Sequence, residues 1–369
     1  MSGFIKTLLV AVAAGIIVGV AMIYISDWNE ERKATQIPET QNPENTTDFA
    51  GGLGTAEQPY LISTPDQLAR IGSKPSASFR LISDIDLYGK TWSPIPVFQG
   101  HLDGNGKTIS NMSIAQSISA LTSDTYVGMF KEVLPEATIS DVSLVNTSIT
   151  VTGSIINSES AHSTNYQLVS GALVGKNSGT IQNCLVDATL SITFTGRWTN
   201  FTSPDYDEAS RVYNRFGTIV ISGGIAGINT NSGIIKESVT SGSIAATYNQ
   251  TGGDNDCSVY NYAGGITGLN DGGIIQSTTS SAAVSLVSNF RYTGATLVGT
   301  PWQPLGVEPY MHTYAGGSIG LNYSGTVTQT ISTGARNTSV LIEGTNYWGT
   351  GSSYENNYEK EGDIACNKP

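Results

Sequence analysis

Charged residues are scarce in this sequence, and basic residues are scarcer than acidic ones. Only 13% of the 369 residues are charged, with 18 lysines and arginines against 30 aspartates and glutamates. The formal net charge is therefore −12. A nucleic-acid partner needs clustered lysine and arginine to neutralise its phosphates, and no basic stripe is present. We expect no binding to nucleic acid.

The short motifs of common hydrolases and nucleotide-binding enzymes are also absent. The three histidines, His101, His162 and His312, lie far apart in the sequence. The chain contains no H-E-x-x-H, no G-x-S-x-G and no P-loop. We therefore expect a protein that is not an enzyme and that carries no cofactor and no metal.

Two acidic stretches are the remaining candidates for chemistry. Asp84, Asp86 and Asp103 lie in SDIDL and LDGNG, and an acidic cluster on one face is what a carbohydrate-active β-helix enzyme would need. An aspartate in such a stretch more simply forms a turn. Asp254 and Asp256 lie in GGDNDCS, which lacks the remaining spaced ligands of a calcium loop, so we expect a solvated turn there.

The composition that is present favours strands and turns over helices. There are 42 glycines, and serine and threonine together make up about a fifth of the chain, far above ordinary usage. Strong helix formers such as leucine are few. The sequence predicts an all-β body.

One long hydrophobic run interrupts this pattern at the N-terminus. Residues 4–25 read FIKTLLVAVAAGIIVGVAMIYI, with Lys6 as their only charge. As a helix, residues 7–25 would extend about 28 Å, enough to cross a bilayer. We predict a helical segment over residues 1–34, which acts as a membrane anchor or filament core, followed by an extended linker over residues 35–53. A cleaved secretory signal is the alternative.

Beyond the linker, a glycine-rich motif occurs four times. Each copy has a glycine followed two residues later by asparagine, then a second glycine, then a β-branched residue two positions further on. The glycine and asparagine pairs are Gly175 and Asn177, Gly227 and Asn229, Gly268 and Asn270, and Gly320 and Asn322. A degenerate relative precedes them around Gly128. Repeats at periods of about 41–52 residues are typical of a solenoid.

The repeat predicts a parallel β-helix over residues 54–345, with a C-terminal tail over residues 346–369. One period is long enough for about two coils. Glycines would occupy corners that need positive φ or close backbone approach. Isoleucines would point inward, and the asparagines would form an amide ladder at a turn. The two long stretches between copies, from residues 191 and 285, are expected to form protruding β-hairpin arms, whose aromatic residues either contact a partner or pack on the solenoid.

Five residues after the second glycine, each copy has a small residue. Three copies have Ser238, Thr278 and Thr330 there, and the fourth has Cys184. We therefore interpret Cys184 as a small buried residue. The other two cysteines, Cys257 and Cys366, either form a disulfide in an oxidising exterior or stay apart.

The four copies resemble the GLUG repeat family of bacterial and archaeal surface proteins, which also occurs beside immunoglobulin A peptidases. The segments GTAEQPYLISTPDQLARI and FQGHLDGNGKTISNMSI look like the usual opening of such a β-helix. The resemblance covers residues 54–335. It implies a fold and surface exposure, and it implies no activity.

The N-terminal run resembles the helix of archaeal type IV pilins and archaellins, in which TLL and AAGI are common. In that family the helices bundle into a filament core. Small residues would allow close helix packing, and they are Ala11, Ala14, Gly15 and Gly19. The resemblance implies a homo-oligomeric filament subunit at the cell surface that is in the membrane at least transiently. A monomeric anchored adhesin that contacts surface glycans or neighbouring cells is the alternative, and a carbohydrate-active enzyme is the third.

Sequons for N-glycosylation are frequent, but with so much serine and threonine about five would arise by chance. The candidates are Asn45, Asn111, Asn146, Asn200, Asn249 and Asn337, with Asn322 belonging to the repeat itself.

Overall fold

The fold is described by a computed structural model, which defines residues 48–157, 166–198, 216–251, 257–293, 310–346, 349–350, 357–362 and 365–367. Residues 45–369 form one compact unit. The predicted N-terminal helix, most of the linker, and the ends of the long stretches lie outside the described residues.

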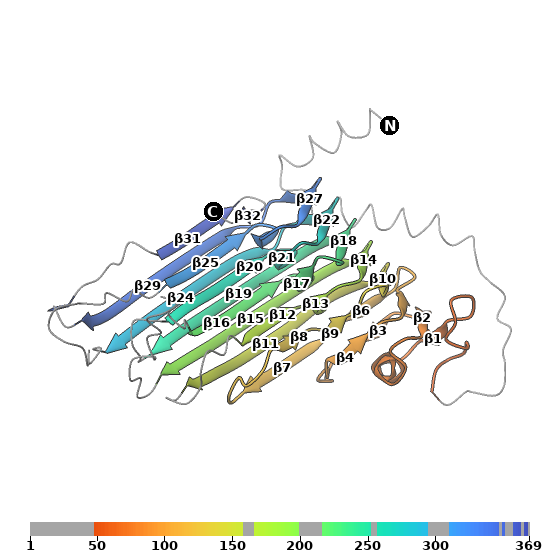
Figure 1. Ribbon diagram of the computed structural model, residues 1–369. Coiled ribbons are helices and arrows are strands. Elements are labelled where there is room, and N and C mark those ends of the chain that lie inside the picture. Colours follow the sequence, from red (N-terminus) through yellow and green to blue (C-terminus); the bar gives the residue numbers. More distant parts are fainter. Residues whose placement is uncertain are drawn as a thin grey trace, which may run out of the picture. The chain divides into compact units, whose positions relative to one another are not determined.

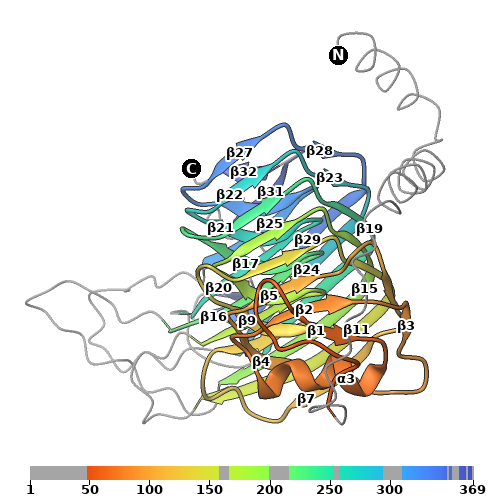
Figure 2. The same ribbon diagram turned by 90° about the vertical axis from the view of Figure 1, so that its right-hand side faces the viewer.

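The described chain is mostly β-strand, arranged in four sheets that it visits in a fixed order (Figures 1 and 2). We number these sheets 1 to 4 in the order in which each coil passes through them. Almost all pairings are parallel and join a strand to its counterpart in the next coil; within the described residues the antiparallel ladder is β29 with β30. From β8 to β29, each coil therefore adds one layer to all four sheets.

Sheet 1 contains eight strands of three or four residues. They are β1 (Tyr60–Ile62), β2 (Ser78–Leu81), β5 (His101–Asp103), β10 (Thr138–Ser140), β14 (Thr180–Gln182), β18 (Ile234–Lys236), β22 (Ile274–Gln276) and β27 (Thr326–Thr328).

Sheet 2 contains the long strands. They are β3 (Ile85–Asp86), β6 (Thr108–Ser110), β7 (Ser113–Ile118), β11 (Ser143–Asn157), β15 (Leu185–Trp198), β19 (Val239–Thr251), β23 (Thr279–Ser280), β24 (Ala283–Thr293), β28 (Ile331–Ser332), β29 (Arg336–Asn346) and β30 (Gly349–Thr350).

Sheets 3 and 4 complete each coil. Sheet 3 comprises β8 (Thr125–Val127), β12 (Gln167–Gly171), β16 (Phe216–Gly223), β20 (Cys257–Gly264), β25 (Tyr310–Gly316) and β31 (Asn357–Gly362). Sheet 4 comprises β4 (Ile95–Phe98), β9 (Phe130–Val133), β13 (Val174–Asn177), β17 (Ala226–Thr230), β21 (Thr267–Asp271), β26 (Ile319–Asn322) and β32 (Ala365–Asn367).

Two expectations from the sequence are corrected by this topology. One repeat period makes one coil, not two, because a coil includes a long strand of sheet 2 that the short motif does not reveal. The described parts of the long stretches do not form hairpin arms. Residues 191–198 belong to β15 and residues 216–222 to β16, and both pair in parallel with neighbouring coils. Inward-facing Leu190, Ile192 and Phe194 bury β15 against the core.

The core fills the space enclosed by the four sheets. From β5 onward sheet 1 supplies one inward residue per coil, and sheet 2 supplies several because its strands are longer. The inward residues of sheet 1 include Ile139, Ile181, Ile235 and Ile275, all fully buried, with Val327 packed against them in the last coil. The first coils are filled by aromatic rings, with Phe98 and Phe130 at 4.9 Å between centroids.

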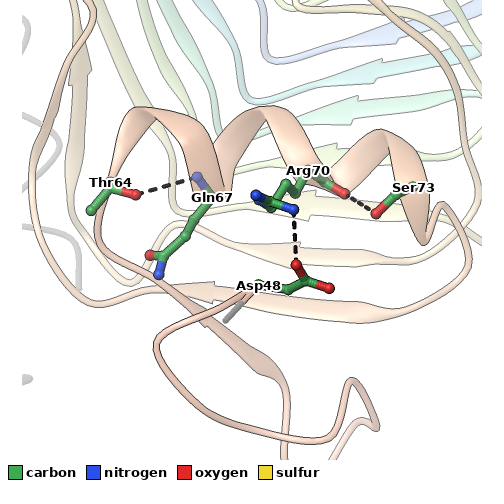
Figure 3. A network of polar contacts seen from close by, with 5 residues as sticks. All are labelled: Asp48, Thr64, Gln67, Arg70 and Ser73. Atoms are coloured by element: carbon green, nitrogen blue, oxygen red, sulfur yellow. Dashed lines mark hydrogen bonds and ion pairs between the residues drawn. The ribbon is translucent and has the colours of Figure 1, made fainter. Parts of the chain in front are cut away.

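A short helical segment covers the N-terminal end of the stack (Figure 2). Helix α3 (Pro65–Ala69) continues into the 3₁₀ helix η3 (Arg70–Ser73), and together they bury Leu68 and Ile71. The Thr64 hydroxyl accepts from the Gln67 amide at 3.3 Å, which caps the helix. Figure 3 shows this cap together with the ion pair of Arg70 and Asp48 at 2.8 Å.

Repeat glycines are required here by close approach, not by positive φ. A Cβ on Gly268 would lie 2.5 Å from Cγ2 of Ile221 and 2.7 Å from the Ser222 backbone. The corner between sheets 1 and 2 does adopt positive φ, but non-glycine residues occupy it. These residues are Asp141, Asn183, Glu237, Ser277 and Gln329, with φ between 50° and 58°.

This distinction predicts the effect of adding one methyl group. Gly268→Ala should lower the free energy of unfolding by about 1–3 kcal/mol because the neighbouring coil must move. Gly72→Ala is the control, because its Cβ would meet Ile95 at an ordinary 3.6 Å. The measurement is the denaturant midpoint of the full chain for both variants. Equal midpoints would show that the coils do not pack as closely as described.

Candidate functional site

The repeat asparagines form a buried ladder at the turn between sheets 4 and 1. The Asn177 side-chain amide donates to Oδ1 of Asn229 at 2.8 Å, Asn229 donates to Asn270 at 3.0 Å, and Asn270 donates to Asn322 at 2.9 Å. Each amide also donates to a backbone carbonyl of its own turn, for example Asn270 to Gly273 at 3.1 Å. Both donor and acceptor groups of the repeated residue are therefore satisfied within the fold.

The glycines two residues before these asparagines, in the same strands of sheet 4, form the floor of an outer corner between sheets 3 and 4. A Cβ at Gly227 would lie 2.3 Å from Cγ1 of Val169, and a Cβ at Gly175 would lie 2.8 Å from Cβ of Tyr126. Outward side chains of sheet 3 thus lie directly over glycines of sheet 4. This arrangement makes a second apolar cluster, separate from the enclosed core. Its buried members are Val169, Ile221, Ile228, Tyr262, Tyr314 and Leu321.

Aromatic rings stack along this corner in successive coils. Tyr262 and Tyr314 lie 5.6 Å apart with an interplanar angle of 14°. Tyr260 and His312 lie 4.9 Å apart at 12°, and His312 Nδ1 lies 3.3 Å from the Tyr314 hydroxyl. Each ring covers a face of its neighbour. Burial raises the pKa of Tyr262, so this hydroxyl stays protonated at neutral pH. The rings act as packing elements, because a sugar-stacking platform needs free ring faces.

The sequence already contained a signal for this cluster. The sheet 3 strands from β12 to β25 end at a glycine, and β8 is followed directly by one. Two residues before each of these glycines, the chain has a large apolar or aromatic residue. These residues are Tyr126, Val169, Ile221, Tyr262 and Tyr314. The pattern was missed because it lies outside the glycine and asparagine motif, and because period-2 alternation is short in sheet 3.

Cys184 lies in the ladder of small residues and is fully enclosed. Its backbone amide donates to the Ser238 hydroxyl at 3.1 Å, and its thiol contacts the Gln182 carbonyl at 3.3 Å. Further along, the hydroxyls of Thr278 and Thr330 lie 3.2 Å apart. Burial raises the pKa of the Cys184 thiol to about 12, so it is an inert thiol at neutral pH.

The acidic residues of the entry coils bond to neighbouring turns. Asp84 accepts from the Thr108 amide at 2.8 Å. Asp103 pairs with Arg80 at 2.9 Å. Asp86 accepts from the Asn111 side chain at 2.7 Å, and this hydrogen bond lowers the pKa of the Asp86 carboxyl. Their oxygens thus hold loops of successive coils together.

The remaining candidates lie in several places. Asn111 and Asn146 have positive φ and hydrogen-bond to one another, Asn249 accepts from Asn289 at 2.9 Å, and Asn337 is exposed on β29. Asn45, Asn200, Asp254, Asp256, His162 and the helix-packing residues Ala11, Ala14, Gly15 and Gly19 lie outside the described residues. Cys257 begins β20 and Cys366 lies in β32, but their side chains are not described, so their pairing stays a prediction.

The described ranges contain neither a metal-binding cluster nor a membrane-spanning helix. These ranges contain no group of three or more histidine, cysteine or acidic side chains placed to hold a metal ion. No helix in the same ranges combines the length and apolarity needed to cross a bilayer.

Comparison with known proteins gives partial similarities. No family model matches the chain, so the likeness to the GLUG repeat stays a resemblance. A protein of Evansella cellulosilytica, provisionally described as a Gly-rich membrane protein, is 33% identical over 151 residues, which is 38% of this chain and 16% of that protein. Halomucin of Haloquadratum walsbyi is 38% identical over 89 residues, 21% of this chain and 1% of that protein. The chain thus aligns with small parts of much longer relatives.

Two solved structures are similar at a low level. A crystal structure from Bacteroides ovatus, provisionally described as an immunoglobulin A1 protease, matches with a TM-score of 0.42 and 17% identity over 87% of both chains. An IgA1 protease matches with a TM-score of 0.29 and 13% identity, over 83% of this chain and 22% of that one. Scores at this level support no conclusion about activity.

The amide ladder predicts a large cost for removing one asparagine. Asn229→Ala leaves a buried donor of Asn177 and a buried acceptor of Asn270 without partners, so we expect a loss of about 2–4 kcal/mol in unfolding free energy. Asn337→Ala, on an exposed strand position, should change it by less than about 0.5 kcal/mol. Equilibrium denaturation of both variants measures the difference, and a matching loss in both would contradict the ladder's role.

The buried thiol predicts a specific alkaline destabilisation. The unfolded thiol ionises near its ordinary pKa of about 9, whereas the folded thiol has a pKa of about 12. Its contribution to stability is therefore complete below pH 9 and is lost as pH rises towards 12. Over that window the unfolding free energy of the native chain should fall more steeply than that of Cys184→Ser, by up to about 1.4 kcal/mol per pH unit. Denaturation at about pH 8 and about pH 10.5 tests this, and parallel slopes would refute it.

Proposed function

We propose that this chain is a non-enzymatic structural protein of the cell surface, which presents its solenoid outside the cell. The observation that supports this proposal is that the repeated residues interact with one another. Amides satisfy amides, rings cover rings, and the entry-coil carboxylates bind turn amides, guanidinium and carboxamide groups. A repeat used in this way builds a rigid body in place of a reaction site. The names of the partial relatives, a Gly-rich membrane protein and halomucin, agree with a surface location.

The N-terminal run is proposed to hold this body in place. Residues 7–25 of the sequence have the length and apolarity of a bilayer-spanning helix. Its resemblance to archaeal pilin helices favours a filament, in which these helices form the core and the solenoids form the exposed surface. Small residues such as Gly15 and Gly19 would permit the close helix packing that such a core requires.

A singly anchored adhesin is the second candidate, and it rests on the same run. Both candidates need the helix, but only the filament needs tight contact between copies. A bulky residue at a small position therefore separates them, because leucine is at least as favourable as glycine in a bilayer. Gly15→Leu should keep the chain in the membrane and prevent assembly.

The test is electron microscopy of material sheared from cells that produce the full chain, with the released protein identified by mass spectrometry. The filament proposal predicts fibres containing this chain, and it predicts their loss in Gly15→Leu and on deletion of residues 1–26. Ile16→Leu, a change between two large apolar residues inside the same run, is the matched control and should leave fibres intact. Recovery only in the detergent-extracted membrane fraction would establish the anchored form. Fibres formed by the deletion variant would refute a helical core.

A further inference from the structure

The outer face of sheet 2 carries a regular array of small uncharged side chains, which we call the hydroxyl face. It comprises three adjacent outward positions on each of β7, β11, β15, β19 and β24, which lie side by side in parallel register (Figure 1). The next outward position of β15 is the charged Asp187, which accepts from the Ser241 hydroxyl and bounds the array on that side. Three positions per strand align in columns across the five coils. The fifteen residues are Ser113, Ala115, Ser117, Ser148, Thr150, Thr152, Thr189, Ser191, Thr193, Ser243, Ala245, Thr247, Ala283, Ser285 and Val287.

These residues are open to solvent, and their hydroxyls are not used by the fold. Each of the fifteen is exposed or partly exposed, in contrast to the inward residues between them. Among the described residues, their hydroxyl groups make no hydrogen bond to protein. The corresponding polar groups of the asparagine ladder are all bonded internally. The hydroxyl face therefore presents donors and acceptors only to what lies outside.

The absence of charge on this face is unexpected for an exposed surface. At the chain's own charge content of 13%, fifteen positions would carry about two charged residues. The hydroxyl face carries none. Charged side chains bind water strongly and point it in fixed directions, so they prevent a surface from joining a neutral ordered lattice.

The chemistry of the face excludes several occupants. Small ligands bind in concave pockets, and the outward side of a sheet offers none. A sugar ring that binds by stacking needs an aromatic face, and the fifteen residues include no aromatic ring. Protein interfaces are depleted of serine and alanine, which are abundant here. A neutral solid made of hydroxyl groups or water remains.

The spacing of the array fits ordered water. Neighbouring strands lie about 4.8 Å apart, so hydroxyls in one column repeat at that distance. Two oxygens bonded at about 2.75 Å to the same tetrahedral water are about 4.5 Å apart. The difference of about 0.3 Å per strand accumulates to about 1.2 Å over five strands, less than half of one oxygen–oxygen contact. Water bridging adjacent rows can thus keep an ice-like order across the face.

We propose that the hydroxyl face binds ice. The ligand is the surface of crystalline water, held by many weak hydrogen bonds and by the methyl groups of threonine and alanine acting together. This inference is independent of how the chain is attached to the cell. It adds an activity to the solenoid that neither a filament nor an anchored adhesin requires.

The experiment measures ice-crystal shape and the gap between melting and freezing points for the full chain in mild detergent, against detergent alone. We expect faceted crystals and a measurable gap for the native chain. Thr193→Arg, on the middle strand of the face, should remove most of the gap, and Thr150→Arg, in the middle column on the adjacent strand, should do the same. Thr326→Arg, an exposed threonine on β27 of sheet 1, is the matched control and should keep it.

Circular dichroism and the unfolding midpoint establish that each variant is folded, so that loss of activity is not loss of structure. Round, unshaped crystals with the native chain would overturn the proposal. An unchanged gap in both face variants would also overturn it. Binding of the native chain to crystalline cellulose without any effect on ice would assign the face to a polysaccharide solid instead.

Discussion

Parallel stacking of one coil on the next, in register and about 4.8 Å apart, is the constraint on which the rest of this structure depends. Each residue lies directly over its counterpart one coil earlier, so every repeated position must tolerate contact with a residue like itself. Isoleucine does so by apolar contact, tyrosine by stacking, and asparagine because its amide both donates and accepts. Like charges in the same place repel.

Close stacking also decides where side chains must be absent. At the corner between sheets 3 and 4, the outward residue of one strand lies over the backbone of the next, and Gly227 leaves room for Val169. The same exchange recurs with Ile221 over Gly268. Each such glycine therefore depends on the large residue of the adjacent coil that packs over it, and the two positions must be considered together. The corner between sheets 1 and 2 has room for side chains. Side chains such as those of Glu237 and Gln329 are exposed there, and their backbone adopts positive φ.

The all-β, parallel and coiled character of the chain was predictable from the repeat because identical spacing in four copies requires identical neighbours. The sequence could not supply the length of a coil. The long strands of sheet 2, such as β15, are rich in serine and threonine like the turns, and their inward residues Leu190 and Ile192 alternate with hydroxyls in a way that equally suits a hairpin. Tertiary packing decides whether such a strand pairs within its own coil or with the next coil. The local sequence contains no pattern that distinguishes the two pairings.

The candidate sites were harder to predict because function in this fold would come from columns of residues, not from motifs along the chain. The hydroxyl face has no recognisable motif. Ser148, Thr189 and Ser243 are far apart in the sequence and become neighbours only when the register is known. The opposite applied to Asp84 and Asp103, whose local sequence suggested chemistry, although the folded chain uses both to hold turns.

Stacking also gives the solenoid a direction along its axis. One inward column of sheet 2 runs from Ile109 through Leu144 and Val186 to Thr240, Ser280 and Ser332, so it changes from apolar to polar along the chain. In the first coils large rings fill the core and α3 covers its end, whereas the side-chain oxygens of Thr240 and Ser332 are buried without hydrogen-bond partners among the described residues. The stability of a repeat protein is a sum of terms for each coil and its interface with neighbouring coils. The N-terminal coils are therefore expected to have the highest local stability in the stack. The five coils that carry the hydroxyl face begin at β7, next to this more stable end, where the array is held most rigidly.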